Sequence, residues 1–181
     1  MFTDTNILTH ELTYFKGLAM SPAKKSLFIS AEVAPFAKTG GLGDVAGSLP
    51  KALAELGHDV RVVMPAYKNI EEGYPGVELL EEQLDVPTGY GMIPCGVFHS
   101  TLPGSDVPIY FIAEWHLFKR DEIYGYWDDS YRFAFFSLAA MELTKMLDWK
   151  PDVLHAHDWH AAPAITWLAT AGQTDEWFQG C

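Results

Sequence analysis

A short apolar run that leads into a glycine-rich turn, and then into a segment with helical spacing, constrains this chain more than any other feature. The apolar run covers residues 27–31 (LFISA) and the turn covers residues 38–44 (KTGGLGD). This is the unit with which α/β proteins bind phosphate groups, because glycine admits a close ligand and the helix N-terminus offers free N–H groups. With the charge of Lys38, it predicts an α/β fold and a site for a small phosphorylated anion.

The spacing of the glycines leaves a second interpretation open. Gly41, Gly43 and Gly47 give G-x-G-x-x-x-G, one residue longer than the dinucleotide-binding pattern, and no Gly-Lys-Ser/Thr follows as in a P-loop. The turn could therefore be a tight strand-to-helix connection that binds nothing.

The first half of the chain predicts a β-α-β unit. Residues 26–32 are short, apolar and without alternation, as in a buried parallel strand, and residues 42–56 carry apolar side chains at helical spacing. Pro50 inside that pattern predicts a kink or a break in the helix. Residues 59–64 predict the next strand, which Pro65 should end.

The middle of the chain carries short strand patterns that glycine and proline interrupt. These segments are residues 77–87, 91–102 and 107–113. They predict a hairpin-like insertion, after which the chain returns to the parallel sheet at Ile109–Ala113. An aromatic and charged loop should follow at residues 114–129, and then a helix from Ser130, as its N-cap, to about Leu147.

The last part of the chain repeats the pattern of strand and helix. Residues 152–156 predict a strand, and the following helix should be capped by Asp158 and run to about Ala171, with Gly172 to end it. The whole pattern predicts a Rossmann-like parallel sheet with helices on both faces and a β-hairpin-like insertion.

A cluster of polar residues lies where this last strand meets its helix. His155, His157, Asp158 and His160 fall within six residues. A metal site is one interpretation, although the helical zinc pattern of two histidines four apart around a glutamate is absent. Helix capping is the second. The third is a ligand site, because the carboxyl ends of parallel strands bind ligands in open α/β sheets, and the Lys38 turn lies at such an end too.

Charge limits the partners. The chain has 24 acidic and 12 basic residues, for a net charge of −12. This excludes nucleic acid and an anionic membrane surface as expected partners, so an anion must be bound in a local pocket. No apolar run reaches the roughly 18 residues that a membrane helix needs.

The cysteines and the N-terminal segment bear on location and domain boundaries. Cys95 and Cys181 fit neither a zinc site nor a disulfide framework, and they agree with a reducing cytoplasm. Residues 1–25 are expected to be a poorly ordered extension without a signal-peptide core, and Met20 is an alternative start.

Three separated motifs resemble one family. They are KTGGLGDV with the Leu-Pro pair at residues 38–50, GHDVRVVMP at residues 57–65 and HAHDWHA at residues 155–161. In this order they resemble the N-terminal half of bacterial glycogen synthases and plant starch synthases, and EIYG at residues 122–125 is similar too.

The resemblance implies a function. Members transfer glucose from ADP-glucose to the non-reducing end of an α-1,4-glucan, such as glycogen, starch or a maltooligosaccharide, with retention of configuration. They use no metal and no cofactor, and two Rossmann-like domains face each other in the arrangement named GT-B. The location implied is the cytoplasm, or the plastid stroma in a plant.

The resemblance also implies site residues. Those that match the family's substrate-binding positions are Lys38, Gly40, Gly41, Asp44, Tyr124 and Asp158. The first three would face the phosphates of ADP-glucose, and the last three would line the sugar or acceptor side of the cleft.

The family pattern extends beyond this chain. The resemblance implies that residues 26–181 form a truncated N-terminal, acceptor-side domain. The family's catalytic histidine and its C-terminal nucleotide-sugar domain would lie past Cys181. The chain is therefore expected to be inactive alone, since half a cleft leaves the departing diphosphate in water.

Two other functions compete with glucosyl transfer. A glucan-binding module without catalysis is one, because sugar rings could stack on aromatic residues of the loop at residues 115–127, which are Trp115, Tyr124, Tyr126 and Trp127. A nicotinamide-linked Rossmann enzyme is the other, although its acidic residue is missing after the second strand, where Pro65 and Ala66 stand.

Overall fold

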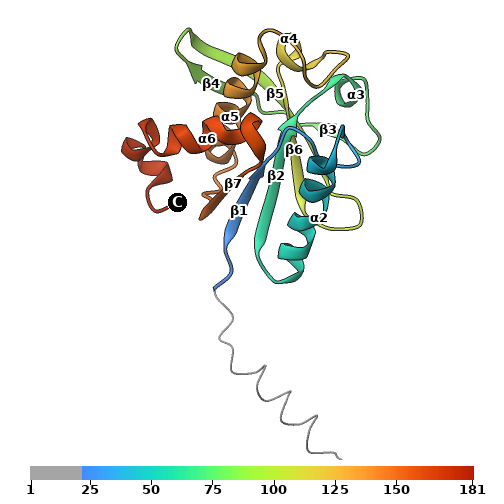
Figure 1. The fold of residues 1–181 in the computed structure, drawn as a ribbon. Coiled ribbons are helices and arrows are strands. Elements are labelled where there is room, and N and C mark those ends of the chain that lie inside the picture. The colour runs from blue at the N-terminus through green and yellow to red at the C-terminus, as the bar shows by residue number, and fades with distance from the viewer. Residues whose placement is uncertain (1–21) are drawn as a thin grey trace, which may run out of the picture.

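The protein forms a seven-stranded mixed sheet with helices on both sides, in a computed structural model that describes residues 22–181 (Figure 1). The strands are β1 (Lys25–Ile29), β2 (Asp59–Pro65), β3 (Glu78–Leu79), β4 (Leu84–Thr88), β5 (Gly91–Thr101), β6 (Pro108–Ala113) and β7 (Val153–Ala156). The helices are α2 (Gly41–Glu55), α3 (Lys68–Glu71), α4 (Trp115–Phe118), α5 (Asp129–Met146), α6 (Asp158–Leu168) and the 3₁₀ turns η1 (Ala171–Thr174) and η2 (Glu176–Phe178).

The centre of the sheet is parallel, as predicted. Its order is β6-β2-β1-β7, with Ile29 opposite Val63 on one side and Ala156 on the other. The helix α2 lies on one face, and α5 and α6 lie on the other (Figure 1). Because both faces are covered, the inner strands are buried along nearly their whole length, which explains their continuous apolar runs.

The predicted hairpin-like insertion is confirmed. The strand β5 pairs antiparallel with both β4 and β6, and β3 pairs with the far end of β5. The strand β6 then pairs parallel with β2, so the chain does return to the parallel sheet. Together these pairings add an antiparallel edge to a parallel core.

Some predicted ends of strands and helices were wrong. The strand β1 stops at Ile29, because the chain turns away after the Ser30 N–H donates to the Val63 carbonyl. Pro65 belongs to β2, since the ladder continues through the next N–H, that of Ala66. The helix α2 continues through Pro50 without a break.

The ends of the two later helices also differ from the prediction. Asp128, not Ser130, is the N-cap of α5, and the Asp129 carboxylate accepts the N–H groups of Gly125 and Tyr126, so the loop itself fixes where the helix begins. The helix α6 ends at Leu168.

Gly172 does not end that helix. It lies in η1, where an added Cβ would come within 2.6 Å of the Trp167 ring. This glycine serves close packing.

The expected extension at residues 1–25 lies almost wholly outside the described residues, and Lys25 already belongs to β1. Among residues 22–181, no helix is long and apolar enough to cross a membrane.

Candidate functional site

The turn between β1 and α2 is held against the helix by close packing. The Ala34 N–H donates to the Gly43 carbonyl over 2.9 Å. At Gly47 an added Cβ would come within 2.6 Å of the Ala34 carbonyl oxygen, so only glycine lets the turn approach the helix this closely. Gly47 therefore has a packing role. The part of the turn with space for a ligand is its tip.

The tip of the turn faces open space. An added Cβ at Gly40 or Gly41 would meet no atom within 4 Å. No side chain caps the N-terminus of α2, and helix geometry leaves the N–H groups of residues 41–43 without partners in the helix. Free N–H groups at a helix N-terminus can bind an anion. The N–H of Gly40, just before them, already donates to Glu32 over 3.1 Å.

The cation predicted for the anion site already has a partner. Lys38 Nζ lies 2.7 and 2.6 Å from the two carboxylate oxygens of Asp44. The two side chains are 45% and 60% exposed, so this is a weak surface ion pair that a bound anion can replace. Both residues lie beside the open N-terminus of α2.

Glu32 is a buried residue beside the turn that the sequence analysis did not single out. It lies three residues after the end of β1 and is 3% exposed, and its carboxylate accepts the N–H and the hydroxyl of Thr39 over 2.6 and 2.7 Å. Burial favours the neutral form, but the hydrogen bonds from Thr39, Tyr124 and Gly40 outweigh it and hold the pKa of Glu32 below its usual range. A charged residue just after an apolar strand and before the glycine turn was the available clue.

Tyr124 comes from the loop between α4 and α5 and reaches the same carboxylate. Its hydroxyl donates to Glu32 over 2.7 Å, and its ring stacks on His160 with 4.4 Å between ring centroids. Burial and the neighbouring Glu32 carboxylate raise the pKa of Tyr124 well above its usual range, so the hydroxyl keeps its proton.

Two histidines of the last cluster, His157 and His160, are buried. His155 and His157 stack with 4.4 Å between centroids, and burial, with His155 beside it, lowers the pKa of His157 to about 4. Burial also lowers the pKa of His160, although the charges of Asp158 and Glu32 oppose it. Neither ring is therefore a cation near neutral pH.

Two ring nitrogens in this cluster have no partner. Nε2 of His157 and Nδ1 of His160 are buried without a hydrogen bond, which is unusual for polar atoms in a protein interior. In the described part of the chain, no group of three or more His, Cys, Asp or Glu side chains is placed to hold a metal ion.

Asp158 has a strained backbone at the start of α6. Its φ is +62°, a value that few residues other than glycine adopt, and its carboxylate accepts the N–H of Trp159 over 2.6 Å. The N-cap position belongs to His157, so Asp158 satisfies the helix start as its first residue rather than as its cap. The side chain is exposed and close enough to Tyr124 to contribute to the raised pKa of that residue.

The predicted residues thus gather at one edge of the sheet. Lys38, Gly40 and Asp44 lie at the end of β1, and Asp158 lies at the end of the neighbouring β7. Glu32 and Tyr124 connect the turn to the start of α6. We name this set of residues the rim.

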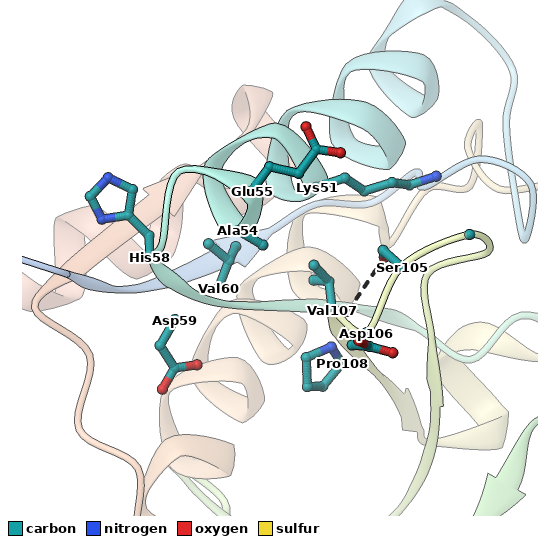
Figure 2. Close-up of a pocket in the computed structure, with 11 residues that line it drawn as sticks. Lys51, Ala54, Glu55, His58, Asp59, Val60, Ser105, Asp106, Val107 and Pro108 are labelled. Carbon is teal, nitrogen blue, oxygen red and sulfur yellow. Dashed lines mark hydrogen bonds between the residues drawn. The ribbon is translucent and has the colours of Figure 1, made fainter. Parts of the chain in front are cut away.

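A hollow of about 360 Å³ lies elsewhere, near the amino ends of β2 and β6. Figure 2 shows Lys51 and Glu55 of α2 above the residues around Ser105, with His58 and Asp59 at one end. It contains no residue of the rim.

Comparisons with known proteins identify the family of this chain. A profile of the family described as the starch synthase catalytic domain matches residues 25–181. The chain belongs to this starch synthase family. Its fold and sheet agree with the GT-B arrangement of that family. The family match therefore argues against the alternative of a nicotinamide-linked Rossmann enzyme.

The relatives are longer than this chain. Glycogen synthase 1 of Geobacter metallireducens is 46% identical over 162 residues, which cover 86% of this chain and 32% of the relative. Glycogen synthase of Bacillus subtilis is 44% identical over 138 residues, which cover 76% and 28%. The chain therefore spans about a third of the length of the relatives that it matches.

A solved structure of the family is similar as well. The catalytic domain of starch synthase IV from Arabidopsis thaliana, bound to ADP and acarbose, matches with a TM-score of 0.74 and 33% identity. The match covers 82% of this chain and 30% of that one.

Proposed function

We propose that this chain forms the acceptor-side part of an enzyme that transfers glucose from ADP-glucose to the non-reducing end of an α-1,4-glucan, with retention. The observation that carries the proposal is the convergence of the KTGG turn, Tyr124 and the HAHDWH cluster at the rim. The relatives named as glycogen synthases, and the starch synthase bound to ADP and acarbose, support the same two substrates.

The rim has separate groups for the two substrates. On the anionic side, the N–H groups at the start of α2 and the ammonium of Lys38 would meet the diphosphate, with Gly40 and Gly41 admitting it closely. Lys38 would leave Asp44 to bind the diphosphate, since the exposed ion pair is weak and a diphosphate carries more negative charge than one carboxylate. Positive groups placed there stabilise the charge that builds up on the leaving diphosphate.

On the sugar side, Asp44, Tyr124 and Asp158 would bind hydroxyl groups. The exposed carboxylates of Asp44 and Asp158 can accept hydrogen bonds. The Tyr124 hydroxyl donates to Glu32, which leaves its oxygen able to accept from a sugar. Lys38 would therefore leave Asp44 as ADP-glucose binds, and ADP would depart as the glucosyl group passes to the acceptor hydroxyl.

A chimera tests the proposal. Residues 25–181 would replace the matching region of the Geobacter metallireducens glycogen synthase, and incorporation of labelled glucose from ADP-glucose into glycogen would be measured. Transfer well above that of the same chimera carrying Asp158→Asn is expected. A correctly folded chimera without transfer would contradict the proposal.

The non-catalytic glucan-binding module remains the second candidate. Trp115 and Trp127 are 60% and 96% exposed, as a stacking surface for sugar rings requires. Tyr126 is a poorer stacking surface, because the guanidinium groups of Arg120 and Arg132 already lie over its ring. Binding of maltotetraose that Trp127→Ala abolishes and Tyr124→Phe leaves unchanged would favour the module.

A cytoplasmic location, which the two free cysteines suggested, is part of the proposal.

A further inference from the structure

A single buried carboxylate joins the two sides of the rim. Glu32 accepts four hydrogen bonds: from the N–H and hydroxyl of Thr39, from the N–H of Gly40 and from the hydroxyl of Tyr124, over 2.6 to 3.1 Å. Thr39 and Gly40 belong to the turn beside the anion site, whereas Tyr124 is 92 residues from Glu32 in sequence and belongs to the sugar side.

Glu32 has no free capacity for chemistry of its own. A buried carboxylate needs hydrogen bonds to remain charged, and these donors fill both of its oxygens. Their effect holds the pKa of Glu32 low, so it carries no proton to give near neutral pH. The group touches the turn and Tyr124, and it lies beneath them rather than in the open space at the tip of the turn.

We propose that Glu32 is a positioning residue that fixes the Lys38 turn and Tyr124 relative to each other, so that the anionic and the sugar side of the rim act as one unit. This inference rests on the proposed function. From Tyr124 the contacts continue through the stacked ring of His160 to the start of α6, so the position of Glu32 also bears on Asp158.

Glutamine cannot replace this carboxylate. Its amide has one acceptor oxygen, and its NH₂ group would face an N–H or a hydroxyl that also donates. At least one of the hydrogen bonds to the turn or to Tyr124 must then be lost. Glu32→Gln should therefore weaken binding on both sides, although it changes no group that contacts a ligand.

The test uses the 181-residue chain and calorimetric titration with maltotetraose and, separately, with ADP. Glu32→Gln is expected to weaken maltotetraose binding at least tenfold and ADP binding several-fold, at a temperature where the variant is fully folded. Glu71→Gln is the control: Glu71 is a half-buried glutamate near β3 and β5, away from the rim, and its substitution should change either affinity less than twofold.

A second comparison separates positioning from stability alone. If Glu32 acts through Tyr124, then Glu32→Gln combined with Tyr124→Phe should bind maltotetraose about as weakly as the weaker single variant. Thr39→Val, which removes one hydroxyl and keeps the N–H, gives a milder variant should Glu32→Gln not fold, and it should weaken ADP binding a few-fold.

The outcomes separate the two proposals. A folded Glu32→Gln with a lower melting temperature and unchanged affinities would overturn the positioning role and leave the proposed function intact. Additive effects of Glu32→Gln and Tyr124→Phe would overturn it also. A wild-type chain that binds neither maltotetraose nor ADP would overturn the proposed function, and the positioning role with it.

Discussion

The two ends of the sheet differ in how their polar groups are satisfied. At the rim, His157 and His160 keep unpartnered buried nitrogens, and Asp158 has a strained backbone. At the amino end, Lys51 donates to the Pro103 carbonyl over 2.8 Å and Asp59 accepts the Trp149 N–H over 2.7 Å. Among the described residues, none that lines the amino-end hollow has a buried polar atom without a partner.

This difference teaches that a hollow alone does not identify a site. In the amino-end hollow Lys51 and Asp59 already have partners, so a ligand that bound these two side chains would have to replace existing bonds. Where the family's motifs converge, Asp158 has a strained backbone, and His157 and His160 have unpaired buried nitrogens, as is typical of functional sites. Asp148, with a φ of +46°, and Arg61, with a buried unpaired Nε, show the same features elsewhere. Changes at the two ends should therefore have very different effects.

The largest expected effect is that of Arg132→Met, beneath the loop that carries Tyr124. The Arg132 side chain is fully buried, donates to the carbonyls of Leu117 and Ile123, and pairs with Asp129. Removing one partner of a buried ion pair costs about 3–5 kcal/mol, since the other groups stay buried and unpaired. Urea unfolding would measure the loss, and a loss below about 1 kcal/mol would show that the loop does not depend on this residue.

The next effect concerns pH. Burial lowers the pKa of His157 to about 4, so the folded state favours the neutral ring, and the unfolded chain binds the proton more readily. The stability from His157 is complete above the unfolded pKa near 6.5 and is lost as the pH falls to about 4. The loss is of order 3 kcal/mol.

Urea unfolding at pH 7.5, 5.5 and 4.5 would measure this dependence. His157→Gln should have a flatter stability profile than the wild type over the same range. Equal slopes for the two proteins would mean that folding does not change the pKa of His157.

A smaller effect is expected for Lys38→Gln. Loss of a charge-assisted contact to a diphosphate should weaken ADP binding by about 1.5–3 kcal/mol, while removal of an exposed side chain should hardly change stability. Lys38→Arg, which keeps the charge in another shape, should bind with intermediate affinity. Calorimetric titration checks this, and unchanged binding with a melting temperature several degrees lower would make the lysine structural.

The smallest effect belongs to the amino end. Lys51→Met removes the bond to the Pro103 carbonyl at an exposed position, and stability should change by less than about 0.5 kcal/mol. Affinity for ADP and for maltotetraose should not change. An effect on binding as large as that of Lys38→Gln would remove the distinction between the two ends.

Much of the fold could be predicted from local patterns. The apolar runs of β1 and β2 and the glycine turn between them indicated the parallel unit, because strands buried on both faces have a distinctive composition. Convergence of the motifs followed from topology, since parallel strands bring their carboxyl ends to one edge. The errors lay at the ends of elements, such as the start of α5, where a loop carboxylate decided the boundary.

The sequence by itself determined the fold class, the family and the edge at which the polar residues meet, because these depend on the period of apolar residues and on short motifs. Only the tertiary structure decided that Glu32 joins Thr39 to Tyr124, that Lys38 pairs with Asp44, and that Gly172 packs on Trp167. The bond between Glu32 and Tyr124 spans 92 residues, and its partners are set by how loops meet over the sheet, which no local pattern encodes.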